Sequence, residues 1–114
     1  TFHKNLVFIL DKVQNSLPDK NNLILITIPD FGVTPTGAMY SGGRDIAKGI
    51  AQFNSLIEKE AVKRGIKFVD IYPETQKMKN NTRLIASDGL HPSALEYSIW
   101  ESMIYPVAYN RLKK

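Results

Sequence analysis

The sequence predicts a layered α/β fold with parallel strands, and two observations support this class. Segments with apolar residues every three to four positions alternate with short aliphatic, β-branched runs along the 114 residues. The resulting order is helix, strand, helix, strand, helix, which favours strands joined by right-handed crossovers. A chain of this length is one domain or part of one. Its 43% hydrophobic and 23% charged residues are typical of a globular protein.

The first helix and the first strand open the chain. Apolar residues repeat at helical spacing over residues 2–17, and the polar segment 18–22 ends that helix. Residues 23–28 are almost wholly apolar, which predicts a strand covered on both faces, and Pro29 ends it. The apolar positions on one helix face are Phe2, Leu6, Ile9, Leu10, Val13 and Leu17.

A long loop separates this pair from the second helix and strand. Repeated glycine and proline residues predict the loop over residues 29–43. Helical spacing then returns from Ile46 to Ala61, and Gly65 suits a left-handed helix cap. Residues 66–71 predict a second strand. Because it carries more polar residues than the first, we expect it to be more exposed, at a sheet edge.

The third helix follows another loop, residues 72–92. Ser93 and Glu96 match a capping box, in which the serine caps the helix and the glutamate bonds back to the serine N–H. Pro106 predicts a kink or break in this helix. The apolar residues of the helix are Leu95, Ile99, Trp100, Met103, Ile104 and Val107.

Two strands are too few for a parallel sheet, which usually has several and is covered on both faces. The first strand is so apolar that it needs a neighbour on each side, and the second supplies one. We therefore expect residues 1–114 to be the C-terminal part of a single larger domain, particularly since the chain starts at Thr1. An exposed strand edge would pair with the N-terminal part of that domain or with a strand-exchanged copy.

Composition argues against several kinds of partner. The net charge of +4 is scattered, and its denser clusters, Lys77 with Lys79 and residues 111–114, lack interleaved aromatics, so nucleic-acid binding is not predicted. No apolar run reaches the roughly 20 residues of a membrane span. Without cysteine and with two histidines, neither a metal nor a cofactor is implied. Cytoplasmic and secreted locations both stay open.

The segment with the clearest chemical character is Asp-Gly-Leu-His-Pro-Ser at 88–93. A carboxylate three residues before a histidine can bind one ring nitrogen and leave the other for a nucleophile. Asp88 and His91 lie beyond the carboxyl end of a predicted strand, where α/β domains place their sites. We therefore take His91 as a candidate general base and Asp88 as its orienting carboxylate. His3, the other histidine, is expected at the surface.

Residues 88–92 resemble the last sequence block of the SGNH (GDSL) hydrolases, in which Asp-x-x-His-Pro supplies the acid and base of a triad. The strand ending at Pro29 and the run 69–72 are similar to the last two strands of that family. The resemblance implies a three-layer α/β/α flavodoxin-like sandwich, of which this chain holds two strands and three helices. It also implies an esterase or lipase that cleaves a small-molecule ester through an acyl-enzyme, with His91 and Asp88 as catalytic pair.

The resemblance also shows what these residues lack. The family's Gly-Asp-Ser nucleophile block and its oxyanion glycine and asparagine precede the matching region. Ser41 has no strained elbow around it, Ser87 would have to fold back across the turn to meet His91, and Ser93 is better explained as the helix cap. We therefore expect this chain alone to be inactive.

A second interpretation is a non-catalytic flavodoxin-like α/β binding module for an anionic ligand. Ser41, Gly42 and Gly43 precede a helix and could hold a phosphate on backbone N–H groups. Asp88 and His91 would then form a structural turn. In the hydrolase interpretation, the loop at 30–43 is a candidate substrate wall, because it leaves the sheet on the same side as His91.

Overall fold

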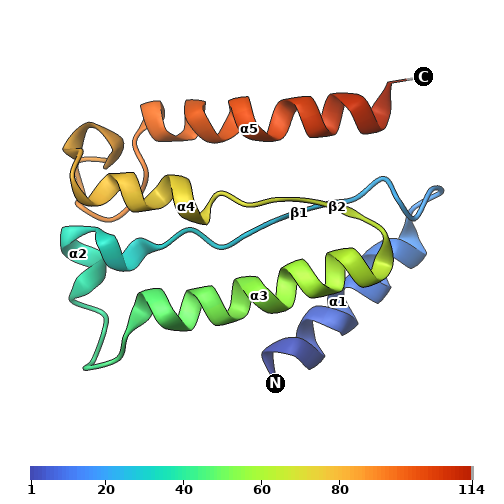
Figure 1. Cartoon of the computed structure of the whole chain (residues 1–114), viewed down its shortest axis with the longest axis horizontal. Coiled ribbons are helices and arrows are strands. Elements are labelled where there is room, and N and C mark those ends of the chain that lie inside the picture. The colour runs from blue at the N-terminus through green and yellow to red at the C-terminus, as the bar shows by residue number, and fades with distance from the viewer. Residues whose placement is uncertain (114) are drawn as a thin grey trace.

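The computed structural model describes residues 1–113 and contains a parallel sheet with helices on both of its faces (Figure 1). Strand β1 (Ile24–Ile26) pairs with β2 (Lys67–Val69), and Leu25 lies opposite Phe68. The predicted α/β class is confirmed at this level, and among the described residues the sheet has two strands.

Three long helices surround the sheet. Helix α5 (Ala94–Leu112) lies on one side, and α3 (Ile46–Arg64) lies on the other with α1 (Phe2–Ser16) packed against it (Figure 1). Asp45 caps the start of α3, its carboxylate accepting a bond from the Lys48 N–H, and Gly65 ends the helix with the predicted left-handed conformation, φ 67°.

The two predicted loops are partly helical. Asp30 and Thr34 each cap a short turn with their side chains, which orders the first loop, and Pro35 occupies the first position of the second turn. These short elements gather at the carboxyl ends of the strands, beside the start of α5 (Figure 1). They are η1 (Phe31–Val33), α2 (Pro35–Ala38), α4 (Tyr72–Thr75), η2 (Gln76–Lys79) and η3 (Thr82–Leu84).

Side chains join the two segments that leave the sheet. The Thr27 hydroxyl donates to Asp70 Oδ1 at 2.9 Å and accepts a bond from the Ile71 N–H at 2.9 Å. Asn54 on α3 bonds both the N–H and the carbonyl of Ile28, at 2.7 and 2.9 Å. Because Ile28 lies beyond the strand ladder, Asn54 supplies the partners that a neighbouring strand otherwise would. The loops at this edge therefore start from fixed positions.

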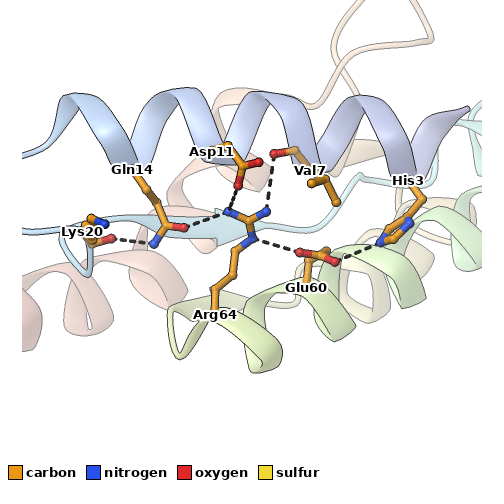
Figure 2. Close-up of polar contacts among 7 residues, drawn as sticks. All are labelled: His3, Val7, Asp11, Gln14, Lys20, Glu60 and Arg64. Atoms are coloured by element: carbon orange, nitrogen blue, oxygen red, sulfur yellow. Dashed lines mark hydrogen bonds and ion pairs between the residues drawn. The ribbon is translucent and has the colours of Figure 1, made fainter.

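A polar network holds α1 on α3 (Figure 2). The Arg64 guanidinium binds Asp11 Oδ1 at 2.8 Å, Gln14 Oε1 at 2.9 Å and Glu60 Oε2 at 2.9 Å. Glu60 is buried, and its second oxygen lies 2.9 Å from Nε2 of His3. The His3 side chain is half exposed, so the expected surface position is correct, but it also belongs to this network.

The Arg64 bond is the main cause that lowers the pKa of Glu60, followed by the bond to His3. A lowered pKa favours the ionised form in the folded protein. The stabilisation is therefore present above the ordinary value of 4.5 and is lost as the pH falls through the folded pKa.

The burial of the first strand differs from what we predicted, whereas the polar residues of the second, Lys67 and Asp70, are exposed as expected. Ile26 in β1 is 42% exposed, whereas Ile66, Val69 and Ile71 in and beside β2 are buried. In the described chain β1 has one neighbour, so nothing pairs with its other edge. Strand β2 is also an edge strand, but α3 and α5 both pack on it, and its polar residue Lys67 points to solvent.

One detail at the start of α5 also differs from the prediction. Ser93 caps the helix as expected, but its N–H donates to the Leu84 carbonyl at 2.9 Å, so Glu96 does not complete a capping box. The Glu96 carboxylate instead accepts a bond from Trp100. The helix also continues past Pro106 to its end without a break. Among residues 1–113, no helix is long and apolar enough to cross a membrane; Lys114 of the basic C-terminal cluster lies outside the described residues.

We expect Arg64→Met to lower the free energy of unfolding by about 2 kcal/mol, because it leaves the buried Glu60 carboxylate without its main partner. Lys63→Met, at the exposed neighbouring position, is the control and should have little effect. Urea unfolding measures both, and the Arg64→Met deficit should shrink below pH 4.5. An Arg64→Met protein as stable as the control would contradict this account.

Candidate functional site

The Asp-His turn is held at its base by backbone hydrogen bonds. Ile85 and Pro92 form an antiparallel bridge, and the Ala86 N–H donates to the His91 carbonyl at 2.8 Å. Gly89 sits at the tip with φ 72°, a conformation that side-chain-bearing residues rarely adopt. The turn is therefore a closed loop whose two ends are joined just before α5 starts.

The Asp88 carboxylate orients the His91 ring. Oδ1 accepts bonds from the N–H groups of Leu90 and His91, both at 2.9 Å, and Oδ2 lies 2.5 Å from Nδ1 of His91. These bonds, the ring bond first, lower the pKa of Asp88 to about 2. Since Asp88 is ionised, it requires Nδ1 to carry a proton, which leaves the Nε2 of a neutral ring as an acceptor.

A contact from the first loop fixes the same turn from the other side. The Thr36 N–H donates to the Gly89 carbonyl at 3.0 Å, and its hydroxyl donates to the Asp88 carbonyl at 2.9 Å. A Cβ on Gly89 would lie 2.8 Å from the Thr36 hydroxyl, so space as well as backbone conformation requires glycine. The sequence contains no local signal for Thr36, because 52 residues separate it from Asp88.

His91 opens onto an apolar pocket of about 520 Å³. The wall combines the first loop, the Asp-His turn and the first turns of α5. The structure thus places part of the loop 30–43 beside His91, as we expected for a loop that forms a substrate wall. The lining residues are Pro29, Phe31, Tyr40, Leu90, His91, Pro92, Tyr97 and Trp100. Of these, sequence reasoning identified His91 alone as functional.

Glu96 is a buried carboxylate directly behind this pocket. Its Oε1 accepts a bond from Nε1 of Trp100 at 2.7 Å, and Oε2 has no partner within the described chain. Burial raises the pKa of Glu96, and the negative charge of Glu74 adds to the effect, whereas the Trp100 bond and Lys77 oppose it. The spacing Glu-x-x-x-Trp places both residues on one helix face, and it was the sequence signal from which this hydrogen bond could have been predicted.

The three candidate serines do not complete a catalytic site. The Ser93 hydroxyl donates to the Arg83 carbonyl at 2.7 Å and accepts the Glu96 N–H at 3.3 Å, so it serves as the cap. Neither Ser41 nor Ser87 forms a hydrogen bond to His91 in residues 1–113. The described residues likewise contain no cluster of three potential metal ligands.

The loop proposed for anion binding already has partners for its charged groups. Arg44 directs its guanidinium to the carbonyls of Ser41 and Tyr40, at 2.9 and 3.2 Å. The Asp45 carboxylate occupies the start of α3, and the adjacent pocket of about 440 Å³ also contains Asp30. The lining of this pocket holds two carboxylates, Asp30 and Asp45, and two cations, Arg44 and Lys79, so it carries no excess of positive charge for an anion.

Comparison with known proteins gives one relative of interest. The chain is 35% identical over 89 residues to a protein named multidomain esterase from Ruminococcus flavefaciens. The match covers 78% of this chain and 10% of that protein, so the chain spans about a tenth of its length. No protein-family model and no solved structure matches the chain.

We expect Glu96→Gln to stabilise the protein at neutral pH by about 1 kcal/mol, because it removes a buried carboxylate charge and keeps an acceptor for the Trp100 N–H. A raised pKa means that the stability associated with neutral Glu96 is complete below 4.5 and declines as the pH rises through the folded pKa. Wild type and Glu96→Gln should therefore converge in urea unfolding at acidic pH.

Glu101→Gln, an exposed position on the same helix, is the control and should show no such pH dependence. A constant difference between wild type and Glu96→Gln across the pH range would show that the buried charge is not its cause.

Proposed function

We propose that this chain is the C-terminal part of a serine-dependent carboxylic ester hydrolase of the SGNH type, with His91 as general base and Asp88 as its orienting group. The observation that carries the proposal is the set of bonds to the Asp88 carboxylate, which holds the ring of His91, a lining residue of an apolar pocket, and leaves Nε2 as the free ring nitrogen. The similarity to part of a protein named multidomain esterase supports the same reaction class.

In the proposed reaction, Nε2 of His91 removes the proton from a serine hydroxyl supplied by another part of the protein. The serine oxygen bonds to the ester carbonyl carbon, and collapse of the tetrahedral intermediate breaks the bond to the alcohol oxygen, which takes the proton from His91. Water then repeats these steps on the acyl-enzyme and releases the acid. Ionised Asp88 stabilises the imidazolium that forms in each half.

The fold proposed for the intact domain is a flavodoxin-like α/β/α sandwich. Helices on both faces of a parallel sheet and the gathering of site residues at the carboxyl ends of its strands fit this architecture (Figure 1). The exposed Ile26 and the unpaired edge of β1 favour a further strand there, from the N-terminal part of the domain or from an exchanged copy.

The test is hydrolysis of 4-nitrophenyl acetate by the full-length protein. We expect His91→Ala to lower kcat about a thousandfold or more, and Asp88→Asn to cause a loss of similar order, because neither variant can hold a correctly oriented base. Both side chains are about half exposed or more, so circular dichroism should show an unchanged fold.

His3→Ala is the matched control, because it removes the chain's other histidine and should leave kcat unchanged. Turnover that persists in His91→Ala would refute the assignment of the base. A chain of residues 1–114 alone should show no turnover above that of its own His91→Ala variant.

A further inference from the structure

The pocket beside His91 is lined by aromatic rings. Phe31 and Tyr40 come from the first loop, and Tyr97 and Trp100 come from α5. The rings of Tyr97 and Trp100 meet edge to face, with centroids 5.1 Å apart and planes at 79°. Such an arrangement leaves ring faces available to a flat apolar group.

Glu96 holds one of these rings in place. Because the Trp100 N–H donates to a fully buried carboxylate, it is not available as a donor in the pocket. A side chain bonded to a buried partner loses rotational freedom before any ligand binds, which lowers the entropic cost of binding. Trp100 thus presents a fixed carbon surface to the pocket.

The position of His91 in this wall indicates which half of an ester the pocket contacts. A general base that later protonates the alcohol oxygen must lie within hydrogen-bond distance of that oxygen. Leu90 and Pro92, on either side of His91, both line the pocket. A group attached to the alcohol oxygen therefore lies next to the apolar surface.

We propose that the pocket binds an apolar ring on the alcohol side of the substrate, so that the preferred substrates are esters of arylmethyl and similar ring-bearing alcohols. The preference among ester substrates rests on the proposed function. Binding of the free alcohol depends on the pocket alone. Tyr97 and Trp100 determine specificity and take no part in proton transfer.

The kinetic test measures kcat/KM of the full-length protein for three esters. Benzyl acetate and methyl phenylacetate are isomers that carry the same ring on opposite sides of the ester, and ethyl acetate has no ring. We expect kcat/KM for benzyl acetate to exceed both others by about tenfold, the effect of burying most of a phenyl ring.

Tyr97→Ala should reduce this preference by about threefold or more, because it removes one aromatic wall. Tyr109→Ala is the control, since Tyr109 lies on the same helix, is similarly exposed (55% against 50%) and is outside the pocket. It should leave the preference unchanged. His91-dependent turnover without a preference for benzyl acetate, or with a preference for methyl phenylacetate, would overturn this inference and leave the proposed function intact.

A binding test separates the pocket from catalysis. Benzyl alcohol should change the fluorescence emission of Trp100. This emission is the difference between the tryptophan signals of the wild type and of Trp100→Phe. Tyr97→Ala should weaken this binding and Tyr109→Ala should not. No emission change in the wild type overturns the inference. Binding without any His91-dependent turnover would instead show that the proposed function has failed, and the assignment to the alcohol side with it.

Discussion

The carboxylate of Asp88 makes the set of bonds on which the candidate site depends. One oxygen holds the backbone of Leu90 and His91, and the other holds the His91 ring. A carboxylate that accepts two backbone bonds has little freedom to turn, so it fixes the ring in one orientation. The same turn packs against Thr36, which links the site to the loop after β1. The apolar pocket thus has its histidine at a defined place.

A group that lowers the stability of the fold, Glu96, lies close to this pocket. Glu96 is buried with one oxygen unpartnered, an arrangement that costs roughly 1–3 kcal/mol in proteins. In return it orients Trp100, which forms part of the wall beside His91. Proteins commonly keep such locally unfavourable groups at functional sites and compensate for them elsewhere. The network of Arg64 with Glu60, between α1 and α3, is a compensating contact distant from the site.

The predictions that proved wrong depended on a residue's neighbours in space. Glu96 matched a capping box, but burial and the nearby Trp100 gave its carboxylate a different partner. The strand at 23–28 was expected to be covered on both faces, yet β1 has a single neighbour among the described residues and Ile26 is 42% exposed. Each expectation used local spacing, which carries no information about packing partners.

Local patterns in the chain were sufficient for the order of the three long helices and two strands, the Gly65 cap and the Asp88–His91 turn, because each involves residues within a few positions of one another. They were not sufficient for the contact of Thr36 with the turn, for the aromatic wall of the pocket or for the burial of the strands. Those features join segments separated by tens of residues, and they exist once the helices and the sheet have packed together. The geometry of the turn is thus encoded locally, whereas the shape of the adjacent pocket follows from long-range contacts.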